Sequence, residues 1–226
     1  MSYVRIEPSR PGLRFSSVEV FQIVVAMAAM TLAFTLWRIG GLAGLDPRLL
    51  SFGGLPLALL VLASFIAVVT AFLLHELAHK AVAQRYGCFA EFRYYPMGLV
   101  LGVVTAAFGF LFAAPGAVMI SGPVNAKQHV RISAAGPGTN LVLAAGFMGL
   151  AAALGSAATR LTDLASFLIG SVALVALVNL FLGGFNLLPF PPLDGSKIFA
   201  LDKPVWIALV IALVALGGVG WWLRVF

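Results

Sequence analysis

Six long apolar stretches restrict the fold of this chain more than any other feature. They lie at residues 18–37, 56–86, 98–120, 132–154, 165–188 and 205–223, separated by short polar connections. A helix needs about 20 apolar residues to cross the roughly 30 Å of hydrocarbon in a bilayer. The composition agrees, because 62% of the 226 residues are hydrophobic and 10% are charged, against about 25% charged in soluble domains. We therefore expect an all-α polytopic membrane protein.

The stretch at 98–120 differs from the others because glycines and prolines interrupt it. Residues 89–95, just before it, are rich in aromatic side chains and alternate loosely, which predicts a short strand. The sequence therefore favours about five to six transmembrane helices with a small membrane-associated β or re-entrant region after the second helix. Cys88 is the single cysteine, which excludes an internal disulfide; we interpret it as a small buried residue.

The formal net charge of +6 comes from basic residues scattered among the short connections, which is typical of topology signals rather than of nucleic-acid binding. We expect no nucleic-acid partner. We expect a multi-pass protein of the cell membrane in which three groups of basic residues lie on the cytoplasmic side. These groups are Arg5, Arg10 and Arg14; Lys80, Arg85 and Arg93; and Lys197 and Lys203.

A metal-binding pattern, HELAH, occupies residues 75–79 near the end of the second stretch. Residues four apart share one face of a helix, so His75 and His79 can ligate one ion. Glu76 lies beside them without being needed as a ligand. In H-E-x-x-H motifs two histidines hold zinc and the glutamate acts as general base. The alternative is a pair of hydrogen-bonded packing histidines, but ionisable residues in membrane segments are costly and usually functional.

A third ligand is expected, because catalytic zinc takes three protein ligands and a water. Asp194 follows FNLLPFPP, whose prolines must end a helix and turn the chain. Its carboxylate could complete the site, or it could cap a helix that starts near Ser196. The other possible donors are His129, Asp46, Asp163, Asp202, Glu7, Glu19 and Glu91, most of which lie in polar connections where solvation explains them. If residues 98–120 crossed the membrane, Asp194 and the HELAH motif would lie on opposite faces. A shared site therefore predicts that 98–120 returns to its starting side.

Three motifs together resemble the site-2 protease family of intramembrane zinc metalloproteases. They are HELAHKAVAQRYG (75–87), FNLLPFPPLDG (185–195) and, more weakly, AAGPGTN (134–140), and the likeness covers roughly residues 55–200. The resemblance implies one Zn²⁺ per chain, bound by His75, His79 and Asp194, with Glu76 as catalytic base. Asn186 matches the family asparagine implicated in holding the substrate carbonyl or oxyanion. From the residues alone, an interhelical hydrogen bond explains Asn186 equally well, and that interpretation is favoured for Asn140 and Asn179.

The resemblance also implies an activity: hydrolysis of membrane protein substrates within or near their transmembrane segments, known as regulated intramembrane proteolysis. The expected partners are a transmembrane protein substrate and the lipid bilayer, with the active site nearer the cytoplasmic face. The family holds substrate on a membrane-associated sheet edge, which we place at 89–95 and 98–104. Residues 1–226 would form a single membrane-embedded metalloprotease domain without a PDZ or CBS domain.

Three other functions are compatible with parts of the pattern. Another membrane zincin, such as a prenyl-protein protease, usually completes its site with a glutamate, so the LDG turn disfavours it. A catalytically silent metal-binding membrane scaffold has no need of a base, so Glu76 disfavours it. A transporter would be expected to show matched interrupted helices in its two halves, which this sequence does not.

Overall fold

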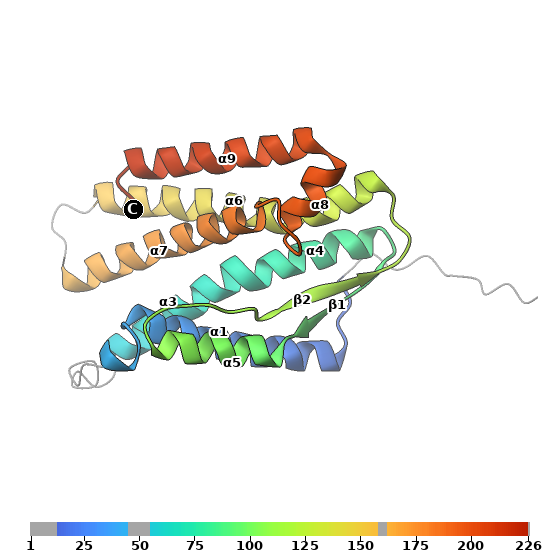
Figure 1. Cartoon of the computed structure of the whole chain (residues 1–226). Helices are drawn as coiled ribbons and strands as arrows, with labels where there is room; N and C mark the ends of the chain where they lie inside the picture. Colours follow the sequence, from blue (N-terminus) through green and yellow to red (C-terminus); the bar gives the residue numbers. More distant parts are fainter. Residues whose placement is uncertain (1–12, 45–54, 158–161, 226) are drawn as a thin grey trace, which may run out of the picture.

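The computed structural model of the chain describes residues 13–44, 55–157 and 162–225. It is a bundle of long helices with a two-stranded hairpin at one end (Figure 1). In chain order the elements are α1 (Ser17–Arg38), η1 (Leu42–Gly44), α3 (Leu55–Val68), η2 (Val69–Leu73), α4 (Leu74–Arg85), β1 (Phe89–Tyr94), α5 (Pro96–Ala107), β2 (Gly116–Ser121), α6 (Ala126–Ala157), α7 (Asp163–Asn186), α8 (Asp194–Leu201) and α9 (Lys203–Trp222).

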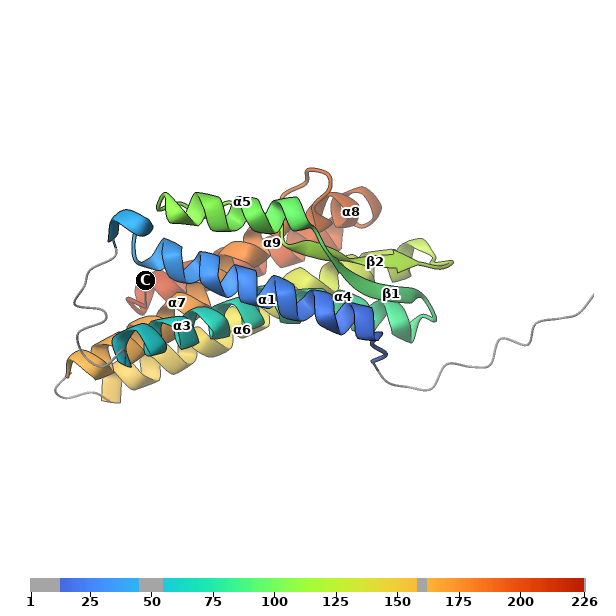
Figure 2. The same ribbon diagram turned by 90° about the horizontal axis from the view of Figure 1, so that it is seen from below.

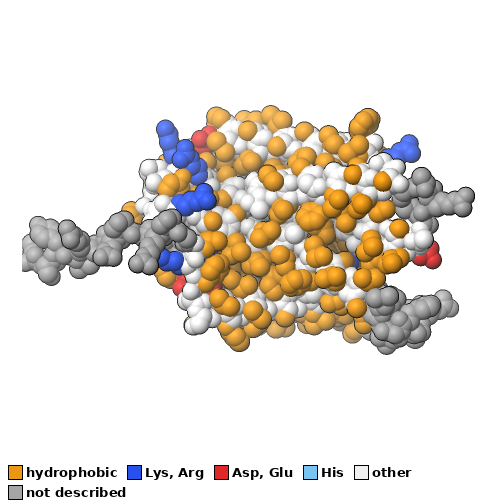
Figure 3. All heavy atoms as spheres, turned by 180° about the vertical axis from the view of Figure 1, so that it is seen from behind, with side chains coloured by type: hydrophobic (Ala, Val, Ile, Leu, Met, Phe, Trp, Pro, Cys, Tyr) orange, Lys and Arg blue, Asp and Glu red, His pale blue; other side chains and the backbone are white. Residues whose placement is uncertain are grey.

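Five of the described helices are long and apolar enough to cross a membrane, which confirms the predicted helical polytopic membrane protein. They are Ser17–Arg38, Leu57–Arg85, Ala126–Ala157, Asp163–Asn186 and Lys203–Trp222. Figure 3 shows the matching surface: a broad apolar face, with most of the visible Lys and Arg side chains gathered at one end. Such a surface suits a bundle whose sides face lipid and whose ends face water.

The second span is one continuous helix from α3 through η2 to α4. Its 31 residues (Leu55 to Arg85) correspond to about 46 Å at 1.5 Å per residue, more than the hydrocarbon thickness. The segment η2 is a π-helix that ends just before α4 and its first histidine, and π-bulges occur often at functional sites. Buried Ala67 and Val68 pack with Met27 and Phe34 of α1 and with Val175 of α7, so this helix lies at the centre of the bundle.

Residues 89–121 leave the end of α4 and return to it. Strands β1 and β2 pair antiparallel, with Phe89 opposite Ser121. Helix α5 between them has 12 residues, or about 18 Å, which is too short to cross. The apolar stretch at 98–120 is therefore re-entrant, as the shared metal site required. Placing a sheet edge at 98–104 was wrong, because those residues lie in α5 and the second strand is β2.

Two glycines of α5 allow the chain that follows the helix to pack closely against it. After α5 the chain runs back along the helix toward β2 (Figure 1). A Cβ atom at Gly98 would collide with the carbonyl of Ala114, and one at Gly102 would lie 2.7 Å from the Cβ of Ala113. Thr105 adds a hydrogen bond between α5 and the returning chain, since its Oγ1 accepts from Phe112 N at 3.1 Å. The interrupting glycines thus permit close packing of helix against returning chain.

Helix α7 ends at Asn186, as the prolines that follow it predict, and a tight turn leads into α8. A Cβ atom at Gly195 would collide with the carbonyls of Leu187 and Leu188. The Leu187 carbonyl also accepts a hydrogen bond from Trp206 Nε1 at 2.8 Å. These contacts fix α8 at the same end of the molecule as the hairpin and the second half of α4 (Figures 1 and 2).

Candidate metal centre

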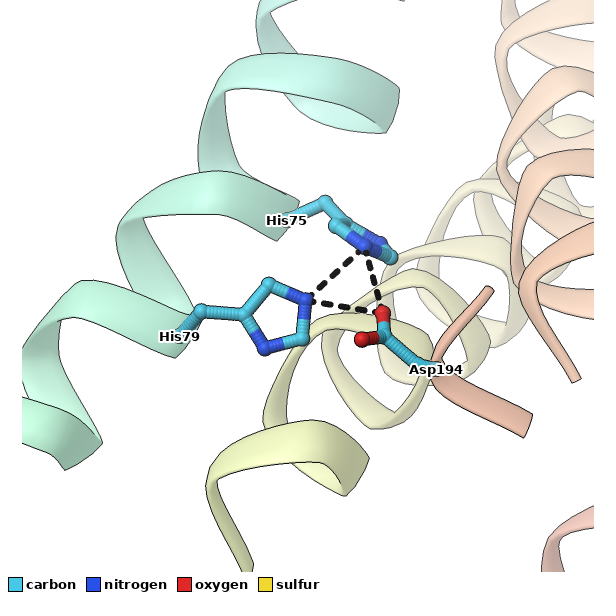
Figure 4. A group of neighbouring side chains, drawn as sticks. All are labelled: His75, His79 and Asp194. Carbon is cyan, nitrogen blue, oxygen red and sulfur yellow. Dashed lines mark hydrogen bonds and ion pairs between the residues drawn. The ribbon is translucent and has the colours of Figure 1, made fainter. Parts of the chain in front are cut away.

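Three ligand-type side chains converge at this end of the bundle (Figure 4). His75 and His79 project from one face of α4, and Asp194 is the first residue of α8. Asp194 Oδ2 lies 3.0 Å from His79 Nε2 and 3.4 Å from His75 Nε2, and the two Nε2 atoms are 3.1 Å apart. All three residues are buried. The structure thus joins the two motifs that are more than 100 residues apart in sequence.

The spacing of these donor atoms fits a metal ion. Tetrahedral zinc with ligand bonds of about 2.0 Å holds its donor atoms about 3.3 Å apart. The three observed separations, 3.0 to 3.4 Å, match the edges of such a tetrahedron. Imidazole nitrogen and carboxylate oxygen are also the donor types that zinc accepts. The three residues therefore form a possible metal site.

The hydrogen bonds of the two rings direct their lone pairs at the centre of the site. His79 Nδ1 lies 2.7 Å from the carbonyl of Ile132, which can only accept, so Nδ1 carries the proton. His75 Nδ1 contacts Asn140 Oδ1 and is assigned the same tautomer. Two unprotonated Nε2 atoms and a carboxylate then face one another, an arrangement that a shared cation stabilises.

Gly136 of α6 provides the space for this centre. A Cβ atom there would lie 2.5 Å from His75 Nε2 and closer still to His79 Nε2. No larger residue could hold the α6 backbone at this distance without displacing both rings. Gly136 belongs to the AAGPGTN segment, so that segment forms the wall of the metal centre opposite α4.

Asp194 is held in the ionised form with one oxygen directed at the histidines. Its Oδ1 accepts a hydrogen bond from Lys197 Nζ at 3.1 Å, which leaves Oδ2 for the centre. Burial raises the pKa of the Asp194 carboxyl, and the positive charge of Lys197 opposes that effect by lowering it. The alternative interpretation of Asp194 as a helix cap is wrong, because α8 begins at Asp194 and Leu193 is its N-cap.

The metal centre opens into a cavity of about 740 Å³ between α4, β2 and the turn before α8. Glu76 lines the cavity beside the two histidines, and its Oε2 accepts a hydrogen bond from Val118 N of β2 at 2.9 Å. Asn186 also lines the cavity, where its Nδ2 donates to the Leu182 carbonyl of its own helix at 3.0 Å. The cavity therefore brings together the metal centre, a carboxylate, an amide and a strand.

Asn140 contributes more to the site than the sequence indicated. Its Nδ2 donates to the carbonyl of Ala71 at 2.9 Å and to Asn179 Oδ1 at 3.1 Å, and Asn179 Nδ2 donates to Thr70 Oγ1 at 3.1 Å. The predicted interhelical hydrogen bonds of both asparagines are thus confirmed. The sequence did not indicate that Oδ1 of Asn140 also orients His75. The signal that could have indicated this role is that Asn140 belongs to AAGPGTN, the weakest of the three motifs.

Comparisons with known proteins agree with the geometry. The family model described as Peptidase family M50 matches residues 63–202. A candidate zinc metalloprotease of Methanocaldococcus jannaschii, MJ0611, is 32% identical over 204 residues, which cover 89% of this chain and 93% of that protein. Rip3 of Mycobacterium tuberculosis, another candidate zinc metalloprotease, is 36% identical over 160 residues, covering 71% of this chain but 33% of its own length.

A third relative, Rip2 of Mycolicibacterium smegmatis, is also named a candidate zinc metalloprotease and is 32% identical over 205 residues, covering 85% of this chain and 72% of its own. No solved structure matches the chain. The family match and the names of these relatives support a metalloprotease. The chain belongs to Peptidase family M50, the site-2 protease family that its motifs resemble.

Proposed function

We propose that this protein is an intramembrane zinc endopeptidase that hydrolyses peptide bonds within or near transmembrane segments of membrane proteins. The observation that carries the proposal is the position of Glu76, one residue from His75 and in the same cavity as all three metal-site residues. The cavity lies within a helical membrane protein, so its substrates would come from the bilayer. Membership in the M50 family supports the protease chemistry.

His75, His79 and Asp194 would hold one zinc ion per chain. When bound, zinc supplies Lewis-acid chemistry and lowers the pKa of a coordinated water toward about 7. Glu76 would act as general base and acid: its carboxylate would accept a proton from the attacking water and pass it to the nitrogen of the leaving amide. Glu76 is available for this role because it lies beside the metal-site residues and is not one of the three possible ligands.

Strand β2 would hold the substrate as an added strand. Phe92 N donates to Glu19 and Val118 N to Glu76, so these paired residues turn their N–H groups away from each other, as in a non-hydrogen-bonded pair. The Val118 C=O and the N–H and C=O of Ile120 therefore point to the edge of β2 remote from β1, where Glu76 already binds the Val118 N–H. Pairing with this edge would keep a peptide extended beside Glu76, which a helical segment needs because its carbonyls are otherwise hydrogen-bonded.

Asn186 would hold the substrate carbonyl or the developing oxyanion. One N–H of its amide donates to Leu182, which leaves the second N–H for a substrate. A donor of this kind stabilises the negative charge that forms during amide hydrolysis. The contact with its own helix would fix the orientation of the amide.

The active site would lie nearer the cytoplasmic face. Most described basic side chains are on the segments at this end of the bundle, and cytoplasmic loops carry an excess of Lys and Arg. Figure 3 shows this asymmetry on one face. The transmembrane substrate would then bring its cytoplasmic end to the cavity.

Zinc content and cleavage, measured on the same purified samples, test the proposal. Wild type and Glu76→Gln should each contain one zinc ion, and only wild type should cleave a membrane-spanning reporter, in a reaction that a chelator stops. Asp194→Ala should lose both zinc and cleavage. Equal cleavage by wild type and Glu76→Gln would refute the role of Glu76. Zinc in both proteins without cleavage of any membrane-spanning reporter would favour the silent metal-binding scaffold.

A further inference from the structure

A buried ion pair joins α1 to the metal-site helix. Lys80 Nζ lies 2.8 Å from both carboxylate oxygens of Glu19, and neither side chain is accessible to solvent. Lys80, one of the basic residues expected on the cytoplasmic side, is thus buried in an ion pair. Lys80 directly follows His79, so the pair lies beside the metal centre without belonging to it.

The pair also binds the backbone of β1, along the edge remote from β2. Lys80 Nζ donates to the carbonyl of Ala90 at 2.7 Å, and Glu19 Oε1 accepts from Phe92 N at 2.8 Å. Gln22, one turn along α1, continues the pattern, since its Oε1 accepts from Tyr94 N at 3.1 Å. Side chains thus replace a third strand and close this edge of the hairpin.

Among the described residues, side chains bind three backbone groups on the outer edge of β1, whereas Glu76 binds one N–H on the edge of β2 in the cavity, so the β2 edge is the more open one. Open edges pair with other chains, and in an apolar environment unpaired backbone groups are costly. Because side chains occupy the outer edge of β1, an added strand would pair with β2. The pair also fixes the position of the hairpin along the axis of α4. Glu76 and Lys80 share one face of that helix, and Glu76 binds Val118 of β2 while Lys80 binds Ala90 of β1.

Stability alone does not explain a buried ion pair in this position. Replacing such a pair by apolar residues of similar volume is often neutral or stabilising, because desolvation of two charges offsets their attraction. Apolar side chains could fill the space between α1 and α4 equally well. They could not bind Ala90 O and Phe92 N, so the backbone contacts are what the polar pair adds.

We propose that Glu19 and Lys80 are positioning residues for peptide-bond hydrolysis. By holding β1, they set the open edge of β2 at the correct place relative to Glu76 and the metal centre. Neither side chain would touch substrate, because neither is accessible to solvent. This inference rests on the proposed protease function.

Two double variants separate hydrogen bonding from charge and packing. In Glu19→Gln/Lys80→Gln, the amide introduced at position 80 can still donate to Ala90 O, and the amide introduced at position 19 can still accept from Phe92 N. In Glu19→Leu/Lys80→Met, the volume is kept and the two bonds that the pair makes to β1 are lost, although Gln84 Nε2 still donates to Ala90 O at 3.2 Å. We expect both variants to bind zinc as wild type does. The amide variant should cleave within about threefold of wild type, whereas the apolar variant should lose about tenfold or more in kcat/KM, because a 1 Å misplacement can cost up to about 100-fold.

Hydrogen–deuterium exchange over residues 116–121 provides a readout that is independent of activity. Exchange should rise in the apolar variant and stay at the wild-type level in the amide variant. Wild-type cleavage and exchange in the apolar variant would overturn the inference, as would equal loss in both variants. If wild type cleaves no reporter, the proposed function fails, and the exchange data alone still show whether the pair holds β2.

Gln22→Leu covers the case in which the apolar double variant does not fold. This single change removes only the acceptor for Tyr94 N, from a half-buried side chain. We expect faster exchange over 116–121, an approximately threefold loss in kcat/KM and unchanged zinc content, since one edge bond of several is lost. Unchanged exchange and cleavage in this variant would contradict the inference.

Discussion

Asn140 Oδ1 contacts His75 Nδ1 in the buried interface between α6 and α4. The same asparagine donates to the carbonyl of Ala71 in the π-helical segment that precedes His75. One amide therefore fixes both the tautomer of the ring and the backbone just before it. Partners of this kind, outside the ligands themselves, raise ligand basicity and metal affinity.

Asn140→Leu should lower zinc affinity by about 10- to 100-fold, the range found when such partners of ligating histidines are lost. Asn140→Asp keeps an oxygen acceptor for His75 Nδ1 but loses the Nδ2 donor to Ala71 and Asn179, so it should bind zinc more tightly than Asn140→Leu and less tightly than wild type. Competition with a chromogenic chelator measures both. An Asn140→Leu protein that binds zinc as tightly as wild type would show that α6 does not orient His75.

Gly136→Ala should abolish zinc binding, because its Cβ would lie 2.5 Å from His75 Nε2 and would displace both rings. Gly138→Ala is the matched control two residues away, where a Cβ meets nothing within 4 Å. Zinc content by mass spectrometry should separate the two variants. Stoichiometric zinc in Gly136→Ala would mean that α6 does not form the wall of the metal centre.

Gly98→Ala should destabilise the fold by about 1–3 kcal/mol, as overpacking does, because the new Cβ would collide with the carbonyl of Ala114. Gly149→Ala, in a helix position where a Cβ meets nothing within 4 Å, should instead be neutral or stabilising by about 0.5–1 kcal/mol. Unfolding midpoints in detergent compare the two. Equal midpoints would contradict the packing of the returning segment on α5.

Lys197→Met should weaken zinc binding by a few fold, less than Asn140→Leu, because the lysine holds only the outer oxygen of Asp194 and is itself partly exposed. Lys203→Met is the control, since Lys203 lies over the ring of Phe199 rather than at the metal site. Chelator competition again provides the measurement. An unchanged zinc affinity in Lys197→Met would show that Asp194 orients itself without the lysine.

Much of the metal centre could be predicted because each of its two motifs is a short, continuous stretch of sequence. Helical spacing places His75 and His79 together, and the requirement that Asp194 reach them implied a re-entrant segment at 98–120. The secondary structure inside that segment was harder to predict. Gly98 and Gly102 serve close helix packing in α5, a use of glycine that depends on the tertiary partner.

The contacts beyond the metal site could not be predicted, because they join residues far apart in sequence. Asn140 and His75 are 65 residues apart, and Glu19 and Lys80 are 61 apart. A lysine near the end of a membrane span usually reaches water, and nothing in the sequence near Lys80 shows that α1 supplies a carboxylate. Such pairs become visible only when the helices are placed in space.

The site of the cut provides the most direct test of an intramembrane zinc protease. Purified wild type and Glu76→Gln, each loaded with zinc in lipid bilayers, are incubated with a single-span reporter in ¹⁸O-labelled water, and the products are measured by mass spectrometry. We expect wild type to cut within or next to the transmembrane segment and to place one ¹⁸O in the new carboxyl group, and Glu76→Gln to leave the reporter intact. A cut made only in the soluble part of the reporter, or the same cut by Glu76→Gln, would contradict the proposed function.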